Sequence, residues 1–346
     1  MTQTALDSGV LCGDCRDVAS VQRLLGGRKA NLVITSPPYA DRRTYDQSSG
    51  FEPIPPEQYV SWFKDVQAVI AEVLAPDGSF VLNIKPHAED GQRVLYVNDL
   101  VAAHVRQWGW RFVDEFCWRK TDDGVPGGWP NRFKNAWEPC YHFSRSDRIK
   151  FHPEAVGHWS EDCFDYSPLN PKSTSGSGLL GSGARGAAAD RGAASYKGKL
   201  QGGSEQSSHS KNVGNEGRHA GVTRPSNVLE IKSESRQGSH AAPFPVALAE
   251  FFINAFTDKT DVVLDVFGGS GTTAIAALRN GRHGYCCEIS PAYTDVIVRR
   301  VQEWSARQFY LDGWHQTFEQ VLSGRRLEAE DAIKESCEEL LAQRGK

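Results

Sequence analysis

Residues 261–288 constrain the fold of this chain more than any other part of the sequence. Residues 261–265 (DVVLD) have the apolar pattern of a buried strand, residues 267–271 (FGGSG) form a glycine-rich turn, and residues 272–279 have a helical pattern. A second strand at residues 284–287 ends at Glu288. Strand, turn, helix and strand in this order predict a parallel α/β sheet with a ligand-binding loop, because glycine lets the backbone approach a ligand and a helix N-terminus offers free N–H groups.

The glycine-rich turn excludes some classes of ligand but does not identify a single one. It is not a phosphate-binding Walker loop, since no Gly-Lys-Ser/Thr follows, and Gly269-Ser270-Gly271 meets only the relaxed form of the dinucleotide fingerprint. Glu288 lies 23 residues after Asp265 and can accept hydrogen bonds from ribose hydroxyls. The pattern leaves a dinucleotide and a nucleoside ligand as alternatives.

A second motif, Thr35-Ser36-Pro37-Pro38-Tyr39, ends another short apolar run at residues 31–34. The two prolines stiffen the loop and remove two N–H donors, so that carbonyl groups remain as acceptors. Ser36 adds another acceptor and Tyr39 an aromatic face. Such a set suits a flat heterocycle that carries an amino group.

Regular spacing predicts further elements between these motifs. We expect helices at residues 57–74 and 95–107 and strands at residues 79–84, 111–118 and 140–143, with a Pro-Asp-Gly turn at residues 76–78. Ser290-Pro291 has the N-cap and first-turn residues of a last helix, and residues 307–346 form a charged tail with a helical pattern. In a parallel sheet, the strands ending at Ser36 and at Asp265 would be neighbours at one edge.

The chain has a net charge of −4, but its basic residues are concentrated in one segment. Residues 166–226 contain eight basic and three acidic residues, a net charge of +5, and residues 173–221 are rich in Gly, Ser and Ala. A segment of this composition buries little apolar area, so it is expected to be partly disordered, either as a basic loop that orders on a polyanion or as an inert linker.

Eight cysteines without a disulfide pattern suit a reducing cytoplasm, and no signal peptide or membrane-spanning stretch is predicted. Cys12 and Cys15 form a CxxC pair, yet no second pair completes a zinc site, so buried thiols are expected and no metal. Pro139-Cys140 resembles the nucleophile pair of carbon-5 cytosine methylation. Because it precedes an apolar strand far from Ser36, a structural cysteine is favoured.

The order of these motifs resembles the amino-methyltransferase family of DNA enzymes in its β-class arrangement. The SPPY motif precedes the basic insertion, and the FGGSGTT loop with its acidic strand end follows. The resemblance covers about residues 9–300 and departs from the family at Val266 and Gly268, where many members carry Pro and Ala. It implies a Rossmann-like fold with a circularly permuted motif order, S-adenosyl-L-methionine as cofactor, and double-stranded DNA with a flipped target base as substrate.

The resemblance also implies roles for individual residues. The amino group would be bound by the catalytic residues Ser36, Pro37, Pro38 and Tyr39, and the cofactor by Asp14, Pro243, Phe244, Asp265, Phe267, Gly269, Ser270, Gly271, Thr272 and Glu288. Trp129 and Arg132 lie in a Gly/Pro-rich aromatic segment that resembles the family's target-base region. With Lys197, Lys199, Lys211 and Arg218 they are the expected DNA contacts.

Four regions follow from this assignment. Residues 9–145 form the catalytic half of the domain, 146–226 the target-recognition insertion, 227–305 the cofactor half and 306–346 a helical extension. Ser-Pro-Pro-Tyr favours methylation of cytosine N4, with adenine N6 as the alternative. RNA or protein methylation and a non-catalytic DNA-binding module are more remote. Family habit suggests a homodimer and, for a site-specific enzyme, a restriction-modification system.

Overall fold

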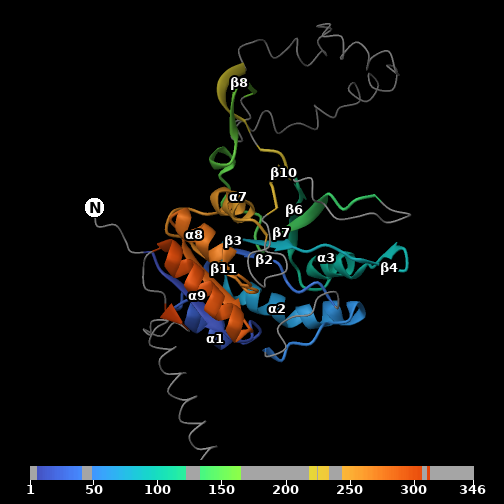
Figure 1. Cartoon of the computed structure of the whole chain (residues 1–346). Helices are drawn as coiled ribbons and strands as arrows, with labels where there is room; N and C mark the ends of the chain where they lie inside the picture. The colour runs from blue at the N-terminus through green and yellow to red at the C-terminus, as the bar shows by residue number, and fades with distance from the viewer. Residues whose placement is uncertain are drawn as a thin grey trace, which may run out of the picture. The chain divides into compact units, whose positions relative to one another are not determined.

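The computed structural model describes residues 6–40, 49–121, 133–164, 218–223, 225–233, 244–305 and 310–311 (Figure 1). These residues belong to two units. The larger unit takes its residues from 1–156 and 226–346, and the smaller from 157–225.

A nine-stranded sheet forms the centre of the larger unit. In spatial order its strands are β10 (Val228–Glu230), β6 (Arg111–Arg119), β7 (Trp137–Ser144), β3 (Leu74–Asn83), β2 (Ala30–Thr35), β11 (Val262–Asp265), β12 (His283–Glu288), β1 (Ser8–Cys12) and β13 (Tyr310–Leu311). Neighbouring strands are parallel, except that β7 runs antiparallel to both β3 and β6.

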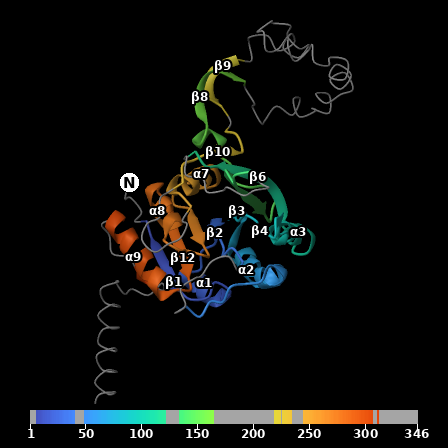
Figure 2. The ribbon, with the colours of Figure 1, turned by 45° about the vertical axis from the view of Figure 1, so that its right-hand side comes forward.

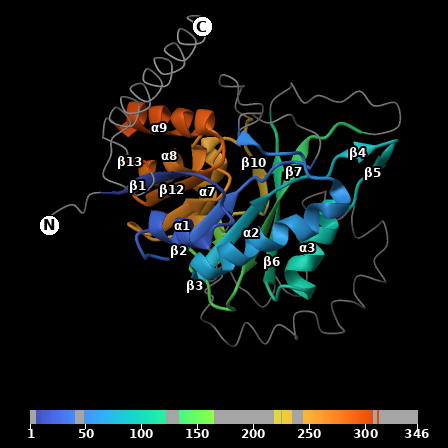
Figure 3. The same cartoon turned by 90° about the horizontal axis from the view of Figure 1, so that it is seen from below.

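Helices cover both faces of this sheet, as Figure 3 shows. One face carries α1 (Val18–Leu24), α2 (Tyr59–Val73) and α3 (Tyr96–Arg106), and the other carries α7 (Val246–Phe256), α8 (Thr272–Arg279) and α9 (Pro291–Ser305). The short helices η2 (Pro56–Gln58) and η3 (Pro153–Ala155) and the paired strands β4 (Ala88–Glu89) and β5 (Gln92–Arg93) complete the unit. The predicted Rossmann-like α/β fold is confirmed.

Most of the predicted elements lie where their apolar spacing placed them. The helix predicted at residues 57–74 is η2 followed by α2, whose buried residues include Phe63, Val66 and Ile70 at a helical period. The predicted N-cap of the last helix is also present, since Ser290 Oγ accepts a hydrogen bond from the Tyr293 N–H at 3.3 Å.

The turn predicted at residues 76–78 is wrong. Strand β3 begins at Leu74, which already pairs with Ala30, and it includes the Pro-Asp-Gly residues before pairing resumes between Ser79 and Leu32. A shift in the β2–β3 register between Ala30 and Leu32 takes up the extra residues.

Sequence spacing did not predict β1, α1, α7 or β10. Helix α1 is short, and Asp17 caps it by accepting hydrogen bonds from the N–H groups of Ala19 and Ser20 at 3.1 and 3.3 Å. Within the tail predicted to be helical, Tyr310 and Leu311 form strand β13 beside β1, and residues 312–346 lie outside the described residues.

The two sequence motifs meet because β2 and β11 are parallel neighbours, with Leu32 opposite Val263 and Val33 opposite Leu264. Their carboxyl ends, Thr35 and Asp265, therefore lie at the same edge of the sheet. This confirms the predicted neighbourhood of two motifs more than two hundred residues apart in the sequence.

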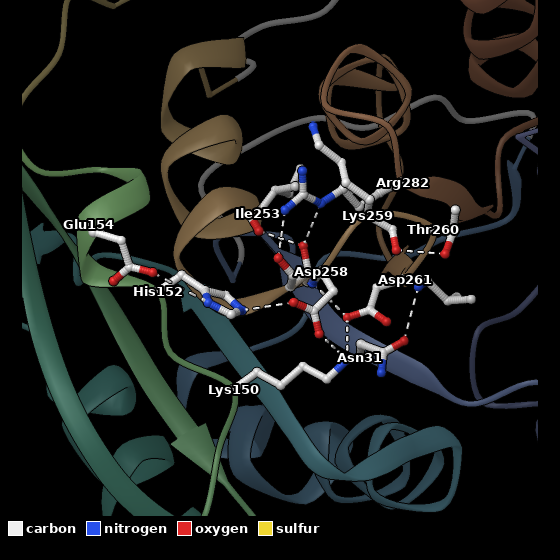
Figure 4. Close-up of polar contacts among 12 residues, drawn as sticks. Asn31, Lys150, His152, Glu154, Ile253, Asp258, Lys259, Thr260, Asp261 and Arg282 are labelled. Carbon is white, nitrogen blue, oxygen red and sulfur yellow. Dashed lines mark hydrogen bonds and ion pairs between the residues drawn. The ribbon is translucent and has the colours of Figure 1, made fainter. Parts of the chain in front are cut away.

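A polar cluster occupies the opposite edge of the sheet (Figure 4). Lys150 Nζ contacts Asp261 Oδ2 at 2.7 Å and Asp258 Oδ2 at 3.0 Å, and His152 Nε2 lies 3.1 Å from Asp258 Oδ1. Arg282 donates to the Thr257 hydroxyl at 2.9 Å and to its carbonyl at 2.6 Å. Through these ion pairs, the segment after β7 is bound to the loop between α7 and β11.

The smaller unit contains an antiparallel pair of strands, β8 (His158–Phe164) and β9 (Arg218–Thr223), visible in Figure 2. The region predicted to be an irregular insertion therefore has regular structure at its two ends. The predicted low-complexity stretch between these strands lies outside the described residues, so its expected partial disorder stays a prediction. None of the described helices is long and apolar enough to cross a membrane.

Candidate functional site

A cavity that is partly open to solvent lies at the carboxyl ends of β1, β2, β11 and β12. Ser36, Pro37 and Pro38 form part of its wall, and the loop after β11 forms another part. The remaining lining residues are Gly13, Asp14, Cys15, Arg16, Ser49, Phe51, Trp62, Phe244, Val266, Phe267, Gly268, Gly269, Ser270, Thr272, Cys287, Glu288, Ile289, Ser290 and Tyr293. The cavity therefore joins the two motifs.

The Ser-Pro-Pro-Tyr loop is held from both sides. The Tyr59 hydroxyl donates to the Pro38 carbonyl at 2.6 Å, and the Ala40 N–H donates to the same carbonyl at 3.1 Å. Ala40 adopts a φ of 47°, a left-handed conformation that is unusual for a non-glycine residue. The Pro38 carbonyl therefore accepts two bonds within the protein, and Pro37 lines the cavity beside it.

Asp265 lies beneath the glycine-rich loop, and its carboxylate connects this loop to Thr35 at the end of β2. The Thr35 hydroxyl donates to Asp265 Oδ1 at 2.6 Å, the Thr273 hydroxyl to Oδ2 at 2.7 Å, and the Phe267 N–H to Oδ1 at 3.0 Å. Burial raises the pKa of this carboxyl to about 7, against the opposing hydrogen bonds from Thr35 and Thr273. Asp265 therefore stabilises the loop from below.

Glu288 holds the glycine-rich loop by a hydrogen bond to its backbone. Its carboxylate accepts hydrogen bonds from the Gly269 N–H at 2.8 Å and the Ser290 N–H at 2.9 Å. Glu288 also lines the cavity, and a carboxylate is a hydrogen-bond acceptor of the kind that ligand hydroxyls require. Gly271, at a φ of 78°, turns the chain into α8.

The departure from the family at Gly268 has a packing reason. A Cβ atom at this position would lie 2.9 Å from Cys286 Cβ and 3.0 Å from Ile297 Cδ1. The Gly268 N–H donates to the Cys287 carbonyl at 2.7 Å, which holds the loop against β12. Glycine is required here because β12 and α9 approach the backbone.

Asp14 lines the cavity as half of an ion pair. Arg16 Nη2 lies 2.6 Å from Asp14 Oδ2, and Arg16 Nε contacts both carboxylate oxygens at 3.0 Å. Burial works to raise the pKa of Asp14, but the hydrogen bonds and charge of Arg16 outweigh it and hold that pKa below its ordinary value. Arg16 is not among the site residues that the sequence predicts.

Aromatic side chains that the sequence analysis did not assign to the site also line the cavity. Trp62, on α2, lies with its ring centroid 5.8 Å from that of Phe267, and Phe51 and Tyr293 line the cavity with them. Trp62 is only partly buried on an otherwise amphipathic helix, and its helical spacing carries no sign of a ligand role. Flat apolar faces of this kind suit an aromatic ligand.

A buried carboxylate lies next to the Ser-Pro-Pro-Tyr loop. Glu138 Oε1 forms ion pairs with Lys85 and, at 2.7 Å, with Lys120. The Tyr39 hydroxyl lies 3.4 Å from Glu138 Oε2 and 3.3 Å from Ser36 Oγ. We refer to Glu138, Lys85 and Lys120 as the Glu138 centre. Sequence reasoning missed it, because its members come from three different strand ends.

The predicted site residues are distributed as follows. Asp14, Ser36, Pro37, Pro38, Phe244, Phe267, Gly269, Ser270, Thr272 and Glu288 line the cavity, whereas Tyr39, Asp265 and Gly271 lie outside its lining. Of the predicted DNA contacts, Arg218 begins β9. Trp129, Arg132, Lys197, Lys199 and Lys211, together with the predicted cofactor residue Pro243, lie outside the described residues.

Cys140 is buried in β7, and burial raises the pKa of its thiol far above the ordinary value. Such a thiol is a poor nucleophile, as the structural interpretation of Pro139-Cys140 expects. In the described parts of the chain, no group of three or more His, Cys, Asp or Glu side chains is arranged to hold a metal ion.

Comparison with known proteins gives consistent matches. The family described as DNA methylase matches residues 30–299. The type II methyltransferase M.PvuII of Proteus hauseri is 27% identical over 289 residues, which cover 78% of this chain and 77% of the relative. M.Cfr9I of Citrobacter freundii is 26% identical over 316 residues, covering 83% and 86%.

Two solved structures have a similar fold. PvuII DNA methyltransferase (cytosine-N4-specific) superimposes with a TM-score of 0.56 and 23% identity, covering 86% of this chain and 87% of that one. The DNA modification methylase TTHA0409 of Thermus thermophilus, complexed with S-adenosyl-L-methionine, superimposes with a TM-score of 0.51 and 20% identity, covering 89% and 98%.

Proposed function

This chain belongs to the DNA methylase family, and from that premise we propose that it transfers a methyl group from S-adenosylmethionine to the N4 amino group of a cytosine in double-stranded DNA. The single observation that carries the proposal is the cavity that Ser36 and Pro37 share with Glu288 and the glycine-rich loop. Acceptors for an amino group and groups suited to a nucleoside therefore lie in one space.

The cavity has the chemistry that S-adenosylmethionine requires. Glu288 would accept hydrogen bonds from the ribose hydroxyls, and Phe267 and Trp62 would cover the adenine ring, with the Asp14–Arg16 pair at the cavity wall. The residues at the start of α8 would bind the carboxylate of the methionine part, because N–H groups at a helix N-terminus favour an anion. When bound, S-adenosylmethionine supplies an electrophilic methyl group on its sulfonium sulfur.

The protein's part in the reaction is to hold and activate the amino group. The lone pair of an exocyclic amino nitrogen is delocalised into the ring, which makes the nitrogen a poor nucleophile. Hydrogen bonds from the amino group to Ser36 Oγ and the Pro37 carbonyl would localise electron density on that nitrogen. Fixed acceptors and a fixed orientation both lower the barrier to transfer.

The target base has to leave the helical stack to reach these acceptors, since an enzyme that modifies a base cannot reach its atoms inside the duplex. We place the base over the Ser36 side of the cavity, next to Tyr39. We assign the target-recognition role to residues 146–226 on their local positive charge.

The choice of cytosine rests on Ser36 and on the relative named cytosine-N4-specific. A serine can also accept a hydrogen bond from the adenine amino group, so adenine N6 is the second candidate. Incubation of the enzyme with isotopically labelled S-adenosylmethionine and duplex DNA, followed by mass analysis of the nucleosides, distinguishes the two. We expect N4-methylcytosine; N6-methyladenine alone would refute the base assignment, and label only in RNA or protein would refute DNA as the substrate.

A further inference from the structure

The Glu138 centre lies directly against the catalytic loop. Glu138 is the second residue of β7, Lys85 follows β3, and Lys120 follows β6. The carboxylate side chain is only 7% exposed, and the two lysines bind one of its oxygens. The other oxygen faces the Tyr39 hydroxyl, which in turn faces Ser36 Oγ.

The ionisation state of Glu138 sets the direction of this chain of contacts. Burial favours the neutral acid, but the charges of Lys85 and Lys120 outweigh burial and hold the pKa of Glu138 below its ordinary value. An ionised carboxylate can only accept hydrogen bonds. The Tyr39 hydroxyl therefore donates to Glu138.

The same logic continues to Ser36. The Tyr39 hydroxyl has a single hydrogen, and this hydrogen is directed at Glu138. In its contact with Ser36, the Tyr39 oxygen is therefore the acceptor and the Ser36 hydroxyl is the donor. With its hydrogen directed at Tyr39, Ser36 Oγ has its lone pairs available as acceptors at the cavity that Ser36 lines. The contacts of 3.3 and 3.4 Å are long for O–H···O bonds, as is common for catalytic contacts before substrate binds.

We propose that Glu138 is a positioning residue that acts through Tyr39 to keep Ser36 Oγ as an acceptor, so that it receives the amino hydrogen of the target base. This inference rests on the proposed function, because an acceptor at Ser36 is useful only when the ligand presents an N–H group. Reversal of the chain would direct the serine hydrogen at the amino group and remove the activation.

The variant Glu138→Gln reverses the chain, because the amide NH2 can donate to the Tyr39 oxygen. We expect kcat for DNA methylation to fall about tenfold or more, while KM for DNA and the Kd for S-adenosylmethionine stay within about twofold. In Tyr39→Phe the relay is already absent, so adding Glu138→Gln should lower kcat no further. Glu115→Gln, the same change at an exposed carboxylate on β6, is the matched control and should leave kcat unchanged.

A pH profile provides a readout that a purely structural role would not change. Among the described residues, the charged or titratable groups near Glu138 are Lys85, Lys120, Tyr39 and the buried thiol of Cys140. Lys120→Met removes one cation and so raises the pKa of Glu138. The acidic limb of kcat should then move to higher pH in Lys120→Met and disappear in the double variant with Glu138→Gln.

The outcomes separate this inference from the proposed function. Methyl transfer by the wild type, with a loss in Glu138→Gln that does not add to that of Tyr39→Phe, supports the relay. Additive losses, or an acidic limb that Lys120→Met leaves in place, overturn the relay and leave the methylase function intact. A wild-type protein that methylates no DNA overturns both.

Discussion

At the scale of single residues, buried contacts within the protein explain why Asp265 and Gly268 occupy their positions at the glycine-rich loop better than ligand contacts do. Sequence reasoning assigned Asp265 to the cofactor, yet the structure uses its carboxylate to join Thr35, Thr273 and the Phe267 N–H beneath the cavity. The departure from the family at Gly268 likewise reflects the close approach of Cys286 and Ile297. A motif alone predicts neither arrangement, because the contacts of Thr35 with Asp265 and of Ile297 with Gly268 form only when separate elements pack together.

Asp265 should give the protein a pH-dependent stability. Because the pKa of the folded-state carboxyl is raised to about 7, the folded protein keeps a proton that the unfolded chain releases near pH 4. The stabilisation is therefore complete below about pH 4 and is lost as the pH rises towards 7, by about 1.4 kcal/mol per pH unit. Asp265→Asn should lack this component.

Urea unfolding of wild type and Asp265→Asn between about pH 4.5 and 8.5 tests this. The free energy of unfolding of the wild type, measured relative to that of Asp265→Asn, should fall as the pH rises to about 7 and stay constant above it. Parallel profiles over the whole range would show that Asp265 does not titrate in the folded protein.

Gly268→Ala should destabilise the protein by about 1–3 kcal/mol, because its Cβ would overlap Cys286 Cβ and force β12 or α9 to move. Gly13→Ala is the matched control, since the nearest atoms to its Cβ are 3.7 Å away on the flexible Leu11 side chain. Thermal unfolding of both variants without added ligand measures the effect. Equal melting temperatures would contradict the packing argument.

At the scale of elements, a regular apolar period was sufficient to predict a long helix, and a glycine-rich turn was sufficient to predict where the next helix begins. The regular apolar spacing of α2 and the glycine turn before α8 placed both helices correctly. Helix α1 has seven residues and β10 has three, too few for a period to appear. The turn predicted at residues 76–78 was wrong because Leu74 already pairs with Ala30, so that Pro-Asp-Gly lies inside β3 where the register shifts and not before the strand.

The polar cluster at the other sheet edge also belongs to this scale, since it fastens one connecting segment to another. Lys150→Met would leave the partly buried Asp261 without its cation, and we expect a loss of about 1–2 kcal/mol in the free energy of unfolding. Methylation rates should not change, because Asp261 and Arg282 precede β11 and β12, whereas the cavity lies at the carboxyl ends of these strands.

Lys29→Met is the matched control for this change. Lys29 is 47% exposed and pairs with the exposed Glu72 at 3.5 Å, so its removal should cost less than about 0.5 kcal/mol. Urea unfolding measures both variants. A loss in Lys150→Met no greater than that in Lys29→Met would show that the cluster contributes nothing beyond a surface ion pair.

At the scale of the whole molecule, an acidic protein contains a strongly basic segment. The sequence alone predicted the fold class and the meeting of the two motifs, because both depend on parallel strand order. It could not predict the Glu138 centre or the aromatic wall with Trp62, which depend on side chains that only tertiary packing brings together.

The charge distribution leads to a prediction about DNA affinity. Replacing Lys197, Lys199 and Lys211 by Ala should weaken binding and reduce the slope of log K against log salt by roughly one for each phosphate that is no longer neutralised. Replacing the exposed cations Arg23, Lys64 and Arg106 of α1, α2 and α3 is the control with equal charge change. Identical slopes in the two triple variants would show that net charge, not the basic segment, determines binding.

The measurement that tests the central claim most directly is the single-turnover rate of methyl transfer by Ser36→Ala, together with its affinity for S-adenosylmethionine. If Ser36 accepts the amino hydrogen at a cavity whose other side binds the cofactor, transfer should slow roughly 100-fold while the affinity stays within about threefold. Transfer at the wild-type rate would contradict the account, because the amino group would then be activated elsewhere.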